Sequence, residues 1–400
     1  MKRIQTVADV NLTGKKVLVR VDFNVPISNG KVTDNTRIRA SLPTVEHLLR
    51  HSNKVILLSH LGRPNGQKNS KYTLRPVAQE LSFLLRRPVL FLDDCLGPEV
   101  ASTIDELGDG SVILLENLRF YAEEEANDPT FSAKLASYGE AYVNDAFGTA
   151  HRAHASTVGI PRLIPIRVAG FLMQRELEFL GAKTSQPERP FTVILGGAKV
   201  SDKIAVIDAL LNRCDAMLIG GAMAYTFKFA LGETVGKSLV EPNRVEDAHR
   251  ALLKARDKKV ELILPVDSQC TDLLDLEKKK IGKLRTVEGS IPDGWIGVDI
   301  GPKTIRSFGK CIADSRTILW NGPVGVFEIP ACAEGTSAIA KFIADSKALS
   351  IVGGGDSIGA LHASGRAEDI SFISTGGGAS LEFLEGKELP GVAALDRKQT

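Results

Sequence analysis

Short apolar runs alternate with longer, helix-compatible stretches along the whole chain. Most runs are four to eight residues long and lack polar alternation, which is typical of parallel strands buried on both faces. Stretches between the runs, such as 36–50 and 334–346, predict helices. The pattern predicts the α/β class, with strands at residues 16–23, 54–59, 89–92, 111–115, 141–143, 191–195, 216–219, 261–265, 295–300, 317–320, 349–352 and 372–374.

A division of the chain is expected near residues 170–190. Residues 171–180 have a helical pattern that ends at Gly181, and Pro187 and Pro190 precede the next apolar run. A helix between two open-sheet domains could act as a hinge. An ordinary surface helix between consecutive units explains the same pattern, and the residues alone leave both interpretations open.

Composition limits the class of protein. A chain of 400 residues with 43% hydrophobic and 24% charged residues is typical of a soluble protein with two or three domains. No apolar run approaches the ~20 residues of a membrane helix, and the first residues lack the apolar stretch of a signal peptide. Five cysteines without a Cys-x-x-Cys pair fit a reducing cytoplasm. The net charge of +2 argues against a broad nucleic-acid or membrane surface.

The two halves of the chain differ in charge and glycine content. Residues 1–185 carry a small net positive charge and 12 of the 37 glycines, whereas residues 186–400 carry a small net negative charge and 25 glycines. A mild basic bias suits small anions better than a polynucleotide.

Basic and amide side chains follow the apolar runs of the first half. Ligands of open parallel sheets bind at the carboxyl ends of strands, so residues 22–24, 59–64, 116–119 and 144–152 are the first candidates for a site. These segments contain Arg63, Arg119 and Arg152, and Arg37 could add a fourth arginine. Arginine matches carboxylate and phosphate oxygens, so convergent arginines predict a small polyanion. The alternative for each arginine is a surface ion pair.

Two histidines in this half raise the question of a metal site. His151 and His154 are spaced as helical ligands could be, but no carboxylate or cysteine follows in a zinc-like pattern. Anion binding or hydrogen bonding in the core is the favoured interpretation.

Glycine-rich segments follow the apolar runs of the second half. Glycine lets the backbone approach a ligand closely, and the free N–H groups of a following helix favour phosphate. Lys199 and Lys203, four residues apart, are expected on one helix face with an anion between them. The alternatives are plain tight turns and two solvated lysines. The glycine segments are 196–197, 220–221, 353–355 and 376–378.

Several standard motifs are absent. Residues 232–238 are one residue short of a P-loop, and no dinucleotide-binding glycine fingerprint follows the first strand of either half. The missing fingerprint counts against a nicotinamide dehydrogenase. A hinged sugar-phosphate-binding protein would explain the arginines but not the glycine-rich half, and it would normally be exported.

With these residues in view, the chain resembles the phosphoglycerate kinase family over nearly its whole length. The resemblance rests on segments in the family's order: 20–26, 59–64, 115–121, 144–157, 195–203, 320–328, 353–357 and 374–391. It implies two doubly wound, Rossmann-like parallel-sheet domains joined by a helical hinge. The expected N-terminal domain is 1–170 with a returning segment of about 385–400, and the C-terminal domain is 171–384.

The resemblance also implies ligands and site residues. The N-terminal domain would bind 3-phosphoglycerate or 1,3-bisphosphoglycerate, and the C-terminal domain would bind ATP or ADP with Mg²⁺ on Asp356. The family suggests a monomer, and the composition predicts a cytoplasmic protein that binds no nucleic acid and no membrane. The implied substrate residues are Asp22, Phe23, Asn24, Arg37, His60, Leu61, Gly62, Arg63, Arg119 and Arg152. The implied nucleotide residues are Lys203, Gly297, Asn321, Glu328, Gly354, Gly355, Asp356 and Ser357. The implied catalytic residues are Arg37, Lys199, Gly376, Gly377 and Gly378.

The sequence departs from the family pattern at three places. Phe372 replaces a usual histidine, and Val324 replaces a usual methionine. Residues 226–230 read Thr-Phe-Lys-Phe-Ala instead of Thr-Phe-Leu-Lys-Ala, which puts in doubt only the role of a lysine near the adenosine. None of these changes affects the expected phosphate-transfer residues.

Overall fold

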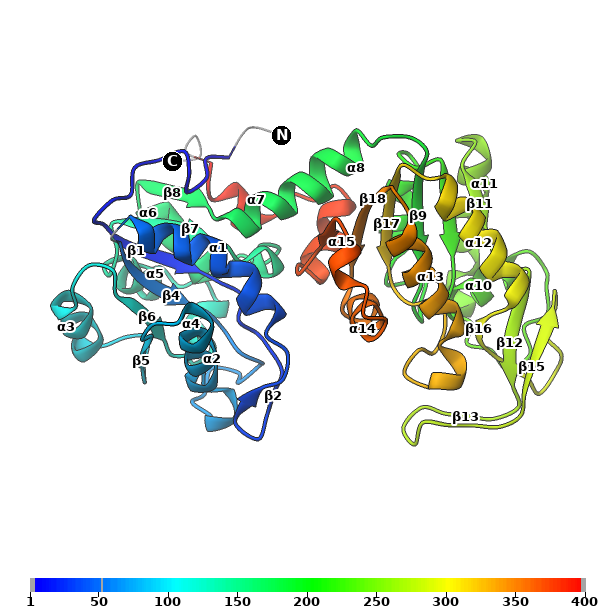
Figure 1. Cartoon of the computed structure of the whole chain (residues 1–400), viewed down its shortest axis with the longest axis horizontal. Coiled ribbons are helices and arrows are strands. Elements are labelled where there is room, and N and C mark those ends of the chain that lie inside the picture. The colour runs from blue at the N-terminus through cyan, green and yellow to red at the C-terminus, as the bar shows by residue number, and fades with distance from the viewer. Residues whose placement is uncertain (1–3, 52, 397–400) are drawn as a thin grey trace. The chain divides into compact units, whose positions relative to one another are not determined.

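A computed structural model describes residues 4–51 and 53–396 of the chain. Contacts divide it into two compact units: unit 1 comprises Met1–Glu178 and Glu388–Thr400, and unit 2 comprises Phe179–Lys387. Each unit is built on a six-stranded parallel sheet with helices between the strands (Figure 1). The predicted α/β class with two parallel sheets is confirmed.

Unit 1 contains a sheet of strand order β5-β6-β4-β1-β7-β8, with every neighbouring pair parallel. The three strands of this sheet that follow β1 in the chain, β4, β5 and β6, all lie to one side of β1. The last two, β7 and β8, lie to its other side, so the strand order reverses between β1 and β7. The strands are β1 (Lys16–Arg20), β4 (Lys54–Leu58), β5 (Leu90–Leu92), β6 (Val112–Leu115), β7 (Ala141–Asn144) and β8 (Ile166–Ala169), with a hairpin of β2 (Ile27–Ser28) and β3 (Lys31–Val32). The α-helices are α1 (Thr36–Arg50), α2 (Arg75–Leu85), α3 (Pro98–Glu106), α4 (Ala122–Glu125), α5 (Pro129–Ala136), α6 (Ile160–Leu163), α7 (Phe171–Leu177) and α16 (Pro390–Ala393).

The core of unit 1 explains the lack of polar alternation in its strands. In β1, Val17 and Val19 pack in one cluster with Ile38 of α1 and Leu81 of α2. The alternate residues of β1 lie on the opposite face of the sheet, because successive side chains of a strand point to opposite sides. Both faces are covered, so the runs are apolar throughout.

Unit 2 contains a sheet of strand order β11-β10-β9-β17-β18-β19, which is the doubly wound order 3-2-1-4-5-6. The order reverses between β9 and β17. Its strands are β9 (Phe191–Leu195), β10 (Ala216–Ile219), β11 (Glu261–Ile263), β17 (Thr317–Asn321), β18 (Leu349–Gly353) and β19 (Phe372–Ile373). Its α-helices are α8 (Lys183–Ser185), α9 (Ile204–Leu210), α10 (Met223–Ala230), α11 (Val245–Asp257), α12 (Pro302–Asp314), α13 (Glu334–Asp345), α14 (Gly355–Ala363) and α15 (Gly378–Leu384).

One predicted parallel strand belongs to a different sheet. The run 295–300 forms β16 (Ile296–Ile300), which pairs antiparallel with β12 (Asp267–Thr271) in a three-stranded sheet completed by β15 (Leu284–Glu288). The prediction was wrong because β16 is buried on both sides like a parallel strand, so its composition does not reveal its partner. A two-stranded hairpin of β13 (Leu274–Asp275) and β14 (Lys280–Ile281) lies beyond this sheet in the chain.

One further prediction needs correction. The helix expected to end at Gly181 continues: α7 runs into a π-helical segment, Glu178–Ala182, and then into α8. Gly181 is buried within this run, and the helix ends before Pro187. Strand β8, at one edge of the sheet in unit 1, was not predicted.

The C-terminal segment packs within unit 1. The amide of Gly391 donates to the carbonyl of Ala150 at 2.8 Å, and the side-chain amide of Asn144 donates to the Gly391 carbonyl at 3.2 Å. The segment that returns to unit 1 starts at Glu388, whereas the sequence analysis expected it to start at about residue 385. Residues 397–400 of the expected segment lie outside the described residues.

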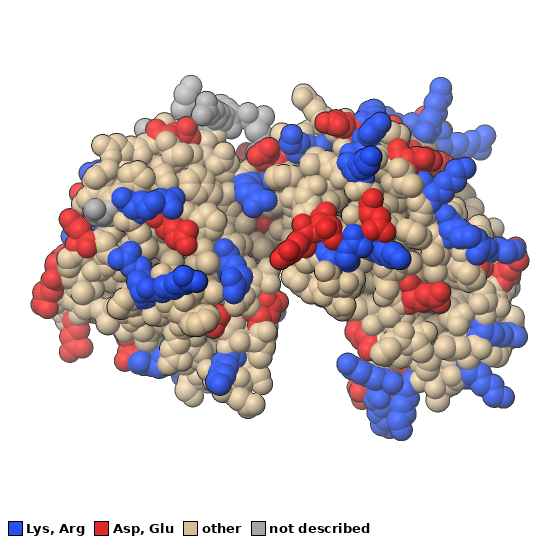
Figure 2. All heavy atoms as spheres, in the orientation of Figure 1, with Lys and Arg blue, Asp and Glu red and all other residues tan. Residues whose placement is uncertain are grey.

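Charged side chains of both signs are interspersed over the face shown in Figure 2. A dense basic group lies on the β13–β14 hairpin, where Lys278, Lys279 and Lys280 are exposed. Among the described residues, no helix has both the length and the apolar character needed to cross a bilayer.

The start of α7 is fixed by side chains from two other elements of unit 1. The amide of Phe171 donates to Thr44 Oγ1 at 2.9 Å, and the amide of Leu172 donates to Asp145 Oδ1 at 2.9 Å. A side chain at Gly170 would overlap the Asp145 carboxylate, so glycine is required there. Burial raises the pKa of Asp145 to about 7, although the Thr44 side chain and then the backbone amides of α7 oppose this shift.

We expect Asp145 to make stability depend on pH. An unfolded aspartate has a pKa near 4, so between about pH 4 and pH 7 the folded state binds more protons at this site. This contribution to the free energy of unfolding is complete below pH 4 and is lost as the pH rises to about 7, by up to about 4 kcal/mol. Urea unfolding of wild type and Asp145→Asn from pH 5 to pH 8 measures it. The difference should change with pH and level off above pH 7.5; parallel curves would refute the assignment.

Candidate functional site

In unit 1 the predicted residues meet at the carboxyl ends of the central strands. Arg37, in the first turn of α1, donates from Nη1 to Asp22 Oδ2 at 3.0 Å and to the Asn24 carbonyl at 3.3 Å. Asn24 Oδ1 in turn accepts from the Gly62 amide at 2.9 Å. These bonds join the exits of β1 and β4 to the start of α1 beside the reversal in strand order, where open α/β sheets bind ligands.

Residues that follow β6 hold the turn after β4 in place. Asn117 accepts from the Leu61 amide at 3.2 Å and donates to the Leu61 carbonyl at 2.7 Å. Arg119 donates from Nη1 to the Gly62 carbonyl at 2.8 Å. Phe23 and Leu61 are buried in the core, so only their backbone can face a ligand.

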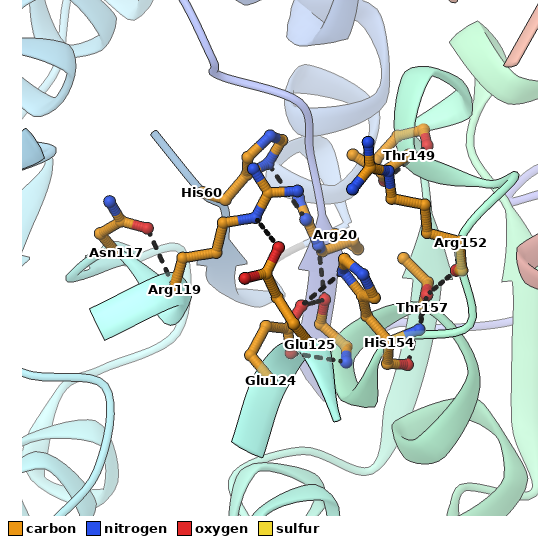
Figure 3. Close-up of polar contacts among 12 residues, drawn as sticks. Arg20, His60, Asn117, Arg119, Glu124, Glu125, Thr149, Arg152, His154 and Thr157 are labelled. Carbon is orange, nitrogen blue, oxygen red and sulfur yellow. Dashed lines mark hydrogen bonds and ion pairs between the residues drawn. The ribbon is translucent and has the colours of Figure 1, made fainter. Parts of the chain in front are cut away.

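Four residues of the predicted set differ in exposure. His60 and Arg119 are buried, Arg152 is half-buried and Arg63 is exposed. Arg119 approaches Glu125 at 3.4 Å, and Arg152 donates from Nε to His151 at 3.3 Å. Figure 3 shows His60, Arg119 and Arg152 gathered around one further arginine, Arg20.

The arginines keep donors that the protein does not use. Among residues 4–51 and 53–396, hydrogen bonds involve only Nη1 of Arg37 and only Nε of Arg152, and no ion pair joins Arg152 to a carboxylate. A guanidinium has five N–H donors. The ion-pair interpretation holds in part, because Arg37 pairs with Asp22 and Arg119 with Glu125. The remaining donors of Arg37 and Arg152 can bind water or a polyanion.

The histidines of the cluster are held neutral. Burial lowers the pKa of His60 well below its ordinary value, and the nearby Arg20, Arg119 and Arg37 lower it further. Burial, with Arg119 next, lowers the pKa of His154 to about 4. At neutral pH these rings can donate or accept hydrogen bonds but add no charge.

Sequence reasoning missed the buried groups behind the cluster. Arg20, the last residue of β1, is 1% exposed and donates from Nε to Ser156 Oγ at 2.7 Å. Glu124 accepts from both the amide and the hydroxyl of Ser156. The available signal was an arginine at the end of an otherwise apolar strand, where it must lie on a covered face.

In unit 2 the reversal in strand order is built from glycine and a buried lysine. A Cβ at Gly196 would overlap the Pro323 carbonyl. The backbone segments that follow β9 and β17 can therefore approach each other this closely only if residue 196 is glycine. Lys203 donates to the carbonyls of Gly196 and Asn321 at 2.6 and 2.7 Å. Burial lowers the pKa of Lys203 to about 8, with Asp356 and Asp202 opposing the shift.

The predicted lysine pair does not share a helix face. Helix α9 begins only at Ile204, and residues 196–203 form an irregular turn. Lys203 is buried, whereas Lys199 is exposed. Bonds from Ser201 to Glu241, at 3.0 Å from the amide and 2.6 Å from the hydroxyl, hold this turn outside the helix.

The two triple-glycine segments open α14 and α15. Gly354 has a φ of +88°, and a Cβ there would lie beside the Asn321 amide, while nothing lies near a Cβ at Gly355 or Gly377. Ser357 Oγ accepts from the Gly322 amide at 2.5 Å and ties α14 to the turn after β17. Gly376 is buried and Gly378 begins α15.

Two predicted nucleotide residues lie on other elements. Gly297 is in β16, and its amide donates to Ser238 Oγ at 2.9 Å. Ser238 is the last residue of the P-loop-like segment 232–238. The hydroxyl of this segment therefore binds the backbone of β16. Glu328 is exposed in the segment between β17 and α13.

The residues fit a magnesium ion that arrives with a nucleotide. Asp356 is exposed in the first turn of α14. In the described part of the chain, no group of three or more histidine, cysteine, aspartate or glutamate residues could hold a metal by itself. Mg²⁺ usually takes one or two protein carboxylates and completes its shell with substrate phosphates and water. One carboxylate at a glycine-rich helix start matches that pattern.

The departures from the family pattern have structural counterparts. Lys228 is 1% exposed, donates to the carbonyls of Pro265 and Gly289 at 3.1 and 3.0 Å, and approaches Glu233 at 3.0 Å. It is therefore part of the interior, and the neighbouring exposed side chain is Phe229. The rings of Phe372 and Phe179 stack at 4.5 Å.

The geometry thus defines an α/β protein with one arginine-lined strand edge and one glycine-lined edge. A family model described as "Phosphoglycerate kinase" matches residues 7–387. The phosphoglycerate kinases of Trichodesmium erythraeum and Acidobacterium capsulatum are 51% and 54% identical, over 99% and 98% of this chain and 99% of each relative. Solved phosphoglycerate kinases from Coxiella burnetii and Pyrococcus horikoshii OT3 match with TM-scores of 0.89 and 0.85. They are 38% and 35% identical and cover 100% and 98% of both chains.

The chain therefore belongs to the phosphoglycerate kinase family. It is a phosphotransferase with a carboxyl group as acceptor, and the family name places it in glycolysis.

Proposed function

We propose that the chain catalyses reversible transfer of a phosphoryl group between 1,3-bisphosphoglycerate and ADP, giving 3-phosphoglycerate and ATP, with Mg²⁺ bound to the nucleotide. Family membership supports the reaction class. The observation that carries the assignment of the acid substrate is the cluster of arginines with unused donors at the strand exits of unit 1.

Phosphoryl transfer of this kind requires the reactants to be positioned and the charge on the transferred group to be stabilised. In the ATP-consuming direction the attacking group is a carboxylate, which is already ionised at neutral pH, so no general base is needed. The depressed pKa values of His60 and His154 agree with this, since neither ring has to carry a proton away. The remaining work is to hold the reactants in line and to stabilise the charge on the transferred group.

The acid substrate would bind in unit 1. The guanidinium groups of Arg63, Arg119 and Arg152 would bind its phosphate and carboxylate oxygens, and Asp22 and Asn24 would accept from its hydroxyl. Arg37 would face the transferred phosphoryl group with the Nη2 and Nε donors that Asp22 and Asn24 leave unused.

The nucleotide would bind in unit 2 at the glycine-lined edge. The amides of the α14 and α15 starts would donate to its phosphates. Lys203 and Lys199 would supply positive charge, and Asn321, Ser357, Glu328 and Gly297 would shape the rest of the site. Asp356 would hold the Mg²⁺ that bridges the phosphates and neutralises their charge. We further propose that the protein acts as a cytoplasmic monomer.

Transfer requires the two ligands to meet, so we propose that the units close about the helical run 171–185 when both ligands are bound. Closure would also exclude water that would hydrolyse the acyl phosphate. Small-angle scattering should show a smaller radius of gyration with 3-phosphoglycerate and a non-reactive Mg-nucleotide together than with either alone. An unchanged radius with both bound would contradict closure.

A coupled assay for ATP formed from 1,3-bisphosphoglycerate and ADP tests the proposed function. We expect ATP formation that depends on both substrates and on Mg²⁺. Binding of the acid without turnover would instead favour a sugar-phosphate-binding protein, and reduction of a nicotinamide cofactor would favour a dehydrogenase.

A further inference from the structure

A chain of buried polar groups runs behind the arginine cluster of unit 1. Glu124 in α4 accepts from the amide and hydroxyl of Ser156, and the Ser156 hydroxyl accepts from Arg20 Nε at 2.7 Å. The other end of the Arg20 guanidinium, Nη2, lies 3.2 Å from His60 Nδ1. Figure 3 shows Arg20 between His60 and Glu124. The chain therefore connects an acidic group in the interior to a predicted substrate ligand.

The contact between Arg20 and His60 determines which ring nitrogen carries the proton. A guanidinium has donors only and is not deprotonated in proteins. Nη2 must therefore donate, and Nδ1 of His60 must accept with its lone pair. A neutral imidazole has one proton, which must then be on Nε2. In the described residues no hydrogen bond joins Nε2 to the protein, so this N–H remains available to a ligand.

Further contacts of these buried groups keep the Arg20 guanidinium in place. Nη1 of Arg20 donates to the carbonyl of Val21 while Nε donates to Ser156, so two further contacts fix the plane of the fork. The Tyr142 hydroxyl donates to the Ser156 carbonyl at 2.7 Å and fixes that residue. Arg20, Ser156 and Glu124 are each at most 1% exposed, so water does not compete for these bonds.

We propose that Arg20, anchored by Glu124 through Ser156, is a positioning residue that fixes His60 as its Nε2–H tautomer. The ring then offers an acid phosphate a neutral donor whose direction and protonation are set before the ligand arrives. This role rests on the proposed function, because it assigns the Nε2–H to the oxygens of the phosphoglycerate. Arg20 itself need not touch the substrate.

The tautomer can be measured without substrate. Nitrogen-15 NMR of protein labelled at its seven histidines distinguishes a protonated ring nitrogen from one with a free lone pair, and His60→Gln identifies the His60 signals. We expect His60 to be neutral from pH 6 to pH 8, with its proton on Nε2. A proton on Nδ1, or a doubly protonated ring, would overturn the proposal whether or not the protein is an active kinase.

Arg20→Lys tests the consequence for the substrate. A single ammonium cannot reach Ser156 and His60 with the same geometry, so we expect a mixture of His60 tautomers. The KM for 3-phosphoglycerate should rise about tenfold or more, the range for a hydrogen bond to a charged group, while kcat changes less than about threefold. An unchanged KM with a mixed tautomer would overturn the positioning role.

Arg167→Lys is the matched control. Arg167 is another buried arginine of unit 1 and donates to the carbonyls of Pro161 and Asp396 at 3.0 and 3.1 Å. Its replacement should lower stability without changing the His60 tautomer or the KM. If Arg20→Lys does not fold, Ser156→Ala removes the hydroxyl that links Glu124 to Arg20 and keeps both charged residues. It should give the same two changes in smaller measure. Their absence would overturn the proposal.

If wild type shows the expected tautomer but no kinase activity, the proposed function fails. The substrate role of the tautomer fails with it, while the assignment of the proton to Nε2 stands. The two failures are therefore distinguishable.

Discussion

Arg37→Ala should lower kcat at saturating substrates by about 10²–10³-fold, which corresponds to about 3–4 kcal/mol of lost transition-state stabilisation. The prediction follows from the geometry of Arg37. Its Nη1 is occupied by Asp22 and Asn24, which set the direction of the fork, while its other donors have no partner among the described residues. Steady-state kinetics with both substrates separates the two possible roles. A change confined to the KM of the acid would make Arg37 a ligand-positioning residue.

Arg39→Ala provides the control for Arg37. Arg39 lies two residues further along α1, is exposed, and donates to Asn35 Oδ1 at 2.9 Å within the same helical segment. Its removal subtracts the same charge from the same helix. We expect kcat within about twofold of wild type, because screening weakens exposed charges that do not touch the reactants.

Asp356→Asn should reduce kcat/KM for the Mg-nucleotide by at least about 100-fold and shift half-saturation to higher Mg²⁺. Asparagine keeps the size and one acceptor oxygen but removes the negative charge that a hard cation prefers. The measurement is the rate as a function of free Mg²⁺ at fixed nucleotide. An unaltered magnesium dependence would remove Asp356 from the metal site.

Glu368→Gln is the matched control for Asp356. Glu368 is exposed in the segment after α14. Its replacement by glutamine removes one carboxylate charge from the same part of unit 2. We expect its magnesium dependence to equal that of wild type. An equal loss in both variants would mean that the effect is a general change of charge and not loss of a ligand.

The parallel strands were predictable because their burial leaves a continuous apolar run. Residues 54–58 and 317–321 are buried at every position, which matches the pattern read from the sequence. The same property explains the error at β16, since its run is equally apolar although its partner β12 is antiparallel. Strand partners depend on residues far away in the chain, and local composition does not encode them.

The candidate site could be predicted only as far as its residues are unusual for their position. Arginines and glycines at strand exits are unusual and were singled out. Arg20 was not, because it ends an apolar strand and its partner Ser156 lies 136 residues later in the chain. Lys199 and Lys203 share a spacing that suggests a helix face. Whether a helix begins at residue 199 or 204 depends on the bond from Ser201 to Glu241, which the spacing does not reveal.

Hydrogen exchange of the full chain with each ligand alone tests the central claim, that unit 1 binds the acid and unit 2 the nucleotide. The account predicts that 3-phosphoglycerate slows amide exchange at residues 22–24, 60–63 and 117–119 and leaves unit 2 unchanged. Mg-ADP should slow exchange at residues 353–357 and 376–379 and leave unit 1 unchanged. Protection by 3-phosphoglycerate at the glycine turns, or by Mg-ADP at the arginine cluster, would contradict it.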